Sequence, residues 1–103
     1  MQEILERVAT EIETKLSHLY EVQHSIKRIE QHIEVVQDRA ERLQPRLKEG
    51  EKNDYLIQKR ELENDLFYEK LAERHINEEI TELKGQLYTL IVIKETGKHP
   101  HAG

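Results

Sequence analysis

Apolar residues recur along the first half of the chain at alternating spacings of three and four. The alternation is unbroken from Leu19 to Leu47, and a repeat of about 3.5 residues draws two helices into a left-handed coiled coil. Upstream, Val8, Ile12 and Leu16 are spaced by four, so the stripe is expected to drift there, as in straight helix packing. The pattern predicts a helix over about residues 2–44. The positions of its seam are Leu19, Val22, Ile26, Ile29, Ile33, Val36, Ala40, Leu43 and Leu47.

The second half predicts another helix, over about residues 54–94, with a less regular apolar stripe. Lys59, Glu69 and Glu73 occupy positions of its seam, and neighbouring apolar residues widen the stripe, as in a helix that touches more than one neighbour. Segment 87–93 is also compatible with a short strand, although its leucines keep to the seam and favour helix. The apolar seam positions are Tyr55, Leu62, Leu66, Ile76, Ile80, Leu83, Leu87 and Leu90.

Helix-breaking residues separate the two halves. Pro45 disfavours helical backbone at the preceding residue, and Gly50 favours the positive φ of a helix C-cap. Asn53 or Asp54 can cap the following helix with a side-chain oxygen. We therefore expect a reversal over about residues 45–53 and an all-α, antiparallel two-helix coiled-coil hairpin. The alternative is one long helix kinked at the proline.

Several apolar residues fall outside both seams and would stay in water in a lone hairpin. Burying a Leu, Ile or Phe side chain contributes about 1.5–3 kcal/mol, so covering these residues favours association. We expect two hairpins to pair as a homodimer in a dimeric four-helix bundle, with a different protein as the alternative partner. The residues are Ile4, Leu16, Val35, Leu56, Ile57, Phe67, Leu71, Ile91 and Val92.

An aromatic pair in the second predicted helix is the expected partner-contact surface. It consists of Phe67 and Tyr68 together with Leu71 and Ala72. Aromatic side chains dominate the energetics of interfaces when they leave water. The alternative is that the same four residues form the core of a homodimer.

Composition excludes several classes of protein. The chain has 103 residues, of which 36% are charged, with a formal net charge of −5 and no Cys. These values exclude a membrane-spanning protein, a disulfide scaffold and a strongly basic nucleic-acid binder. The N-terminal segment lacks an apolar signal region, so a cytoplasmic location is the default expectation.

Basic residues gather near the predicted turn, and acids interleave with them. Asp38 and Glu41 lie among Arg39, Arg42 and Arg46, which cancels much of the positive field. A phosphate-binding surface needs an uncompensated cationic face, so nucleic acid is not the expected partner.

Candidate chemistry is sparse. Glu69 and Glu73 are the carboxylates placed on the seam, but a metal site needs further ligands from other helices. We expect them to be exposed where the seam widens, or to pair with Lys15 or Lys59. The end of the chain, 95–103, carries two histidines and is expected to be a flexible tail. No catalytic constellation or phosphate-binding loop is present, so we expect no metal, no cofactor and no enzymatic activity.

These features favour a non-enzymatic protein–protein interaction module, such as a small coiled-coil adaptor, inhibitor or chaperone-like partner. The alternatives are a self-associating structural spacer or assembly subunit and, after that, a nucleic-acid-linked accessory protein. In outline the two predicted helices resemble the small helical partners of type VII secretion, whose turn carries a Trp-x-Gly motif. This chain reads QPRLKEG over residues 44–50 and contains no Trp, so the resemblance is confined to the outline.

Overall fold

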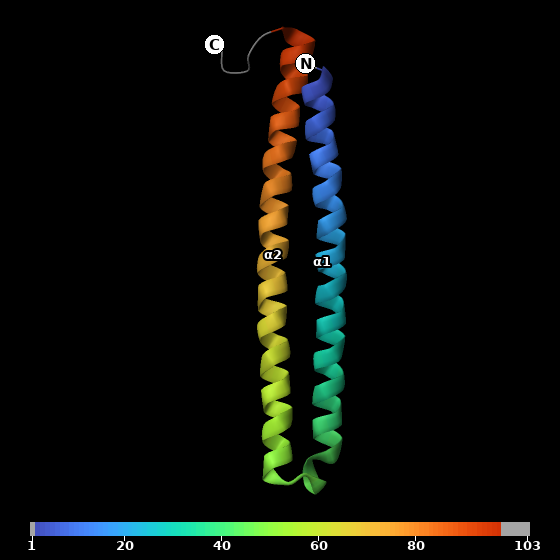
Figure 1. The fold of residues 1–103 in the computed structure, drawn as a ribbon, viewed down its shortest axis with the longest axis vertical. Helices are drawn as coiled ribbons and strands as arrows, with labels where there is room; N and C mark the ends of the chain where they lie inside the picture. The colour runs from blue at the N-terminus through green and yellow to red at the C-terminus, as the bar shows by residue number, and fades with distance from the viewer. Residues whose placement is uncertain (1, 98–103) are drawn as a thin grey trace. The chain divides into compact units, whose positions relative to one another are not determined.

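The computed structural model describes residues 2–97, which form two long α-helices joined by one turn of 3₁₀ helix. Helix α1 spans Gln2–Leu43, the 3₁₀ turn η1 spans Gln44–Arg46, and α2 spans Glu49–Thr96. The helices pack as an antiparallel hairpin, with η1 at the reversal (Figure 1). The predicted all-α hairpin is confirmed. The alternatives of one kinked helix and of a strand over 87–93 are both wrong.

Pro45 and Leu47 make the reversal between the helices. Pro45 lies in the first turn of η1, where a backbone N–H has no intrahelical partner and its loss costs no hydrogen bond. Leu47 follows in extended conformation, with φ −80° and ψ 137°, and its N–H donates to the carbonyl oxygen of Gln44 at 3.4 Å. The reversal is therefore shorter than the predicted one and ends before Glu49.

Helix α2 begins several residues earlier than the sequence predicted. Gly50 is helical and does not adopt positive φ, so its predicted role as a C-cap is wrong. Asn53 and Asp54 lie inside α2 instead of capping it. The first turn carries Glu49 and Glu51, whose negative charges are favourable at the positive end of the helix dipole.

A glycine cap ends α2. Gly97 has φ 68°, the left-handed conformation that follows many helices, and its N–H donates to the carbonyl oxygen of Ile93 at 2.8 Å. The helix therefore continues to Thr96, slightly past the predicted end. Near this cap, Lys94 Nζ donates to the side-chain oxygen of Gln2 at 2.8 Å, so the last turn of α2 lies against the first turn of α1.

The described chain divides into two compact units, each with its own core. Within the described residues, the terminal unit comprises residues 2–20 with 74–97, and the turn unit comprises Glu21–Glu73. The terminal unit buries apolar residues from both helices, whereas the buried residues of the turn unit all come from α1. The buried residues are Val8, Ile12, Ile76 and Ile80 in the terminal unit and Val22, Ile26 and Val36 in the turn unit.

In the turn unit, α2 contributes only half-buried side chains. Its seam there includes the three charged residues identified from the sequence, and all three are half-buried beside the apolar ones. Their aliphatic stems can cover the buried residues of α1 while the charged ends reach water. The half-buried seam residues of α2 in this unit are Tyr55, Lys59, Leu62, Leu66, Glu69 and Glu73.

The three-four alternation of covered positions continues to the start of α1, where the sequence predicted drift. Leu5 and Lys15 are half-buried, and Val8 and Ile12 are buried. Leu16, the third member of the predicted four-residue row, is exposed. Lys15 thus takes the seam position, and its long side chain leaves the leucine on the outside of the pair.

Part of the predicted tail lies outside the described residues, including His99 and His101. Glu95 and Thr96, which the prediction included in that tail, are helical. Within residues 2–97, neither helix has a stretch both apolar enough and long enough to cross a membrane.

Candidate functional site

The predicted partner-contact residues lie on α2 in the turn unit, and most of them are exposed. Phe67 is 63% exposed and Tyr68 is 68% exposed. Their rings meet edge to face, with centroids 5.6 Å apart and an interplanar angle of 78°. Leu71 is also exposed, while Ala72 is half-buried. The two aromatic rings are therefore the main apolar feature that this part of α2 presents to solvent.

The four residues form two adjacent strips on α2. Residues four apart share a helix face, so Leu71 continues the face of Phe67 and Ala72 continues the face of Tyr68. Consecutive residues point about 100° apart around the helix axis. The edge-to-face contact of the two rings joins the strips into one ridge, which we call the aromatic ridge.

Tyr68 also lines a groove between α1 and α2. The groove has a volume of about 370 Å³ and includes Arg28 and His32 from α1 and Asp65 from α2. Arg28 Nη2 donates to Ser25 Oγ at 3.2 Å, which holds the guanidinium on the α1 side. The tyrosine ring therefore borders a polar hollow with both signs of charge, which can orient a polar partner group.

Glu69, one of the two seam carboxylates, lines the same groove. Two outcomes were expected for this residue, exposure at a widened seam or an ion pair with a seam lysine. The structure shows neither, because Glu69 is half-buried, Lys15 pairs with Glu79 at 2.6 Å and Lys59 pairs with Glu63 at 3.8 Å. The expected pairing of these lysines with the seam carboxylates is wrong.

The ion pair between Lys15 and Glu79 joins the two helices of the terminal unit. The hydrogen bond and the positive charge of Lys15 hold the pKa of the Glu79 carboxyl below its ordinary value. The charges of His75 and His18 act in the same direction, and desolvation opposes them. Both partners are partly exposed, so the pair fixes the alignment of the helices more than it stabilises them.

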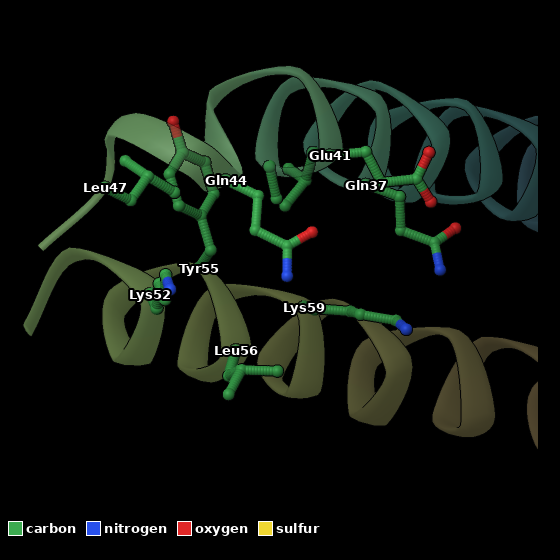
Figure 2. Close-up of a pocket in the computed structure, with 10 residues that line it drawn as sticks. Gln37, Glu41, Gln44, Leu47, Lys52, Tyr55, Leu56 and Lys59 are labelled. Atoms are coloured by element: carbon green, nitrogen blue, oxygen red, sulfur yellow. The ribbon is translucent and has the colours of Figure 1, made fainter. Parts of the chain in front are cut away.

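A second groove, beside the turn, was not predicted from the sequence. It has a volume of about 300 Å³, and Figure 2 shows Tyr55 reaching from α2 toward Leu47 and Gln44. Val36 and Ala40 also line it. Leu47 and Tyr55 are both predicted seam residues, one on each side of the turn. Their spacing in the sequence is the one feature that could have indicated a groove there.

The rim of the turn groove is polar. Lys52 and Lys59 come from α2, and Gln37, Glu41 and Gln44 come from α1 (Figure 2). An apolar floor with ammonium, amide and carboxylate groups around it can accept an apolar side chain that lies next to a polar group.

The basic residues near the turn are partly compensated. Arg42 Nη2 lies 3.1 Å from Asp38 Oδ2, as the interleaving of acids and bases predicts. Among residues 2–97, no group of three or more His, Cys, Asp or Glu side chains is arranged to hold a metal ion.

No protein-family model, no curated protein and no solved structure matches the chain. Function is therefore inferred from the residues and surfaces of the chain itself.

Proposed function

We propose that this chain is a non-enzymatic protein–protein interaction module that works in the cytoplasm through its helical surface, as a small adaptor, inhibitor or chaperone-like partner. One observation supports this most directly. Phe67 and Tyr68 present two aromatic rings, 63% and 68% exposed, at adjacent positions of α2. Fractionation of the native host with an antibody against the chain tests the proposed location.

The aromatic ridge has the composition of an interface anchor. Aromatic residues carry most of the binding energy of many interfaces, because they bury large areas at low entropic cost. Arg28 and Asp65 lie beside Tyr68 and offer opposite charges to a partner's rim. A helix laid along the ridge would cover the two rings, so we propose a helical segment as the partner element.

Site-specific photo-crosslinking tests this function. The full-length chain carries p-benzoylphenylalanine in place of Tyr68 in the native host, and a matched chain carries it in place of Val35, which is 51% exposed on α1 in the same unit. We expect position 68 to capture one abundant protein that position 35 does not. Identical products at both positions, or only a second copy of the chain at position 68, would contradict a separate partner protein.

Self-association into a dimeric four-helix bundle with coiled-coil packing is the second candidate. Within residues 2–97, the exposed large apolar side chains outnumber the buried ones, so a second copy has apolar surface to cover.

Sedimentation equilibrium distinguishes the two candidates. A dimer whose mass is twice 12.3 kDa at micromolar concentration supports self-association. Suppose that the dimer persists after the double substitution F67A/Y68A, while p-benzoylphenylalanine at position 71 no longer captures the protein that it captures in the original chain. This result supports the interaction module. Loss of the dimer with unchanged helicity places the aromatic ridge in the dimer interface instead.

A further inference from the structure

We propose that a second copy of this chain docks on one flank of the terminal unit. This flank, which we call the tyrosine flank, consists of Leu16 and Tyr20 from α1 and Tyr88 and Ile91 from α2, all four exposed. The inference rests on the self-association described above, and it adds the docking face and the pairing of charges across it. It does not involve the aromatic ridge, which belongs to the turn unit.

The four residues lie on the same side of the helix pair. A groove of about 700 Å³ marks the other side, with Glu11 of α1 and Gln86 of α2 in its lining. Leu16 follows Glu11 by five residues and Tyr88 follows Gln86 by two, which are rotations of about 140° and 200° around the respective helix axes. Both side chains therefore point to the flank opposite this groove, and Tyr20 and Ile91 follow at helical spacings of four and three.

The tyrosine flank carries two acids on α1 and both signs of charge on α2. On α1, Glu6 and Glu13 share the face of Leu16. On α2, Arg74, Lys84 and Glu95 share the face of Tyr88. Arg74 Nε donates to Glu78 of its own helix at 3.2 Å. The part of the chain that the structure describes gives neither Glu13 nor Lys84 an ion pair.

A twofold contact needs a surface that complements itself. When the flanks of two copies face each other across an axis parallel to the helices, α1 of one copy lies against α2 of the other. Glu13 of each copy then faces the strip that carries Lys84 of the other, so this pair of opposite charges occurs twice, once on each side of the axis. The charge pattern of this flank is therefore suited to a second copy of the chain.

The ion pair between Lys15 and Glu79 aligns the charges along the helices. Glu13 lies two residues from Lys15, and Lys84 lies five residues from Glu79 in the same direction along the pair. At about 1.5 Å per residue, the levels of Glu13 and Lys84 differ by about 4.5 Å, a distance that the two flexible side chains can span. Glu13 of one copy therefore lies beside Lys84 of the other.

Charge reversal at these two positions tests the contact. The full chain is compared with E13K, K84E and the double variant E13K/K84E by sedimentation equilibrium from low to high micromolar concentration, with helicity checked by circular dichroism. Each single reversal places like charges at two symmetric sites, so we expect dimerisation to weaken about tenfold or more. The double variant restores opposite charges, so we expect dimerisation within about threefold of the original chain.

The control variant is E11K, which changes the same charge on the opposite flank and is expected to leave dimerisation within about threefold.

A chain that remains at 12.3 kDa throughout rules out self-association and this docking face together, and leaves the partner-binding function in place. A dimer that resists both single reversals but is lost in F67A/Y68A overturns this face alone. Failure of the double variant to recover, or equal weakening by E11K, also overturns it. If a single variant loses helicity, the original chain with a photo-reactive residue in place of Tyr20 provides the test. The proposed contact requires a crosslink to residues 74–77 of the second copy, and a dimer without this crosslink overturns it.

Discussion

Lys15 Nζ lies 2.6 Å from Glu79 Oε2, which makes a seam lysine of α1 the ion-pair partner of a residue beside the seam of α2. The contact explains why Lys15 is half-buried while its neighbour Leu16 is exposed. A charged seam residue restricts how two helices can be aligned, because a shifted alignment leaves the charge without its partner.

The lowered pKa of Glu79 predicts a stability difference that depends on pH. The ionised carboxylate stabilises the folded chain above its ordinary pKa of 4.5, and this contribution is lost as the pH falls through the lower folded value. We therefore expect E79Q to destabilise the chain near pH 7 and to have a smaller effect as the pH falls, because the carboxyl then becomes neutral like the amide. Urea unfolding over a series of pH values from 7 downward measures this, with E82Q as the matched control. An equal destabilisation at every pH would contradict the ion pair's role.

Gly85 predicts a stabilising substitution. It lies inside α2, and a Cβ added there meets no atom within 4 Å. Because glycine loses more backbone entropy than alanine on helix formation, G85A should raise the free energy of unfolding by about 0.5–1 kcal/mol. Urea denaturation measures the change. G97A is the control and should not stabilise, because Gly97 has positive φ. A less stable G85A chain would show that the position serves another role.

Two isoleucines with different exposure should differ in how much they stabilise the chain. Ile80 is 5% exposed, whereas Ile57 is 54% exposed. Removing one methyl group by I80V should cost about 0.5–1.5 kcal/mol, since the loss leaves a gap in a packed site. The same change at Ile57 should cost less than about 0.5 kcal/mol. Thermal and urea unfolding of both variants check this, and similar losses at both positions would mean that Ile57 is covered in solution.

Glu73 is a polar residue on the seam, and we expect it to limit the free energy of unfolding of the chain. It is half-buried on α2, and the structure gives it no ion pair within the described residues. E73L should stabilise the chain by about 1 kcal/mol, because the leucine buries apolar surface against α1. E61L, at an exposed position of the same helix, should have little effect. No gain from E73L in urea unfolding would indicate that the carboxylate is satisfied as it stands.

Much of the hairpin was predictable because its main signal is local and repeated. Val22, Ile26 and Val36 recur at three-four spacing, and the structure buries all three. The turn was less predictable. Gly50 and Asn53 are common at helix ends, but a proline in a 3₁₀ turn and an extended Leu47 complete the reversal before either is needed.

The candidate surfaces were also predictable only where they depend on one helix, and not where they depend on how the two helices are aligned. The exposure of Phe67 followed from its distance from the seam. The groove beside Tyr55 and the partner of Lys15 did not follow, because both depend on how far α1 is shifted along α2. The apolar pattern of a single helix does not contain that shift.

The hydrogen bond between Lys94 and Gln2 has a practical consequence for protein engineering. It holds the first turn of α1 beside the last turn of α2, and segments whose ends lie close together tolerate insertion into a host loop and circular permutation. A permuted version can be opened at the extended Leu47, with a linker that joins Thr96 to Gln2.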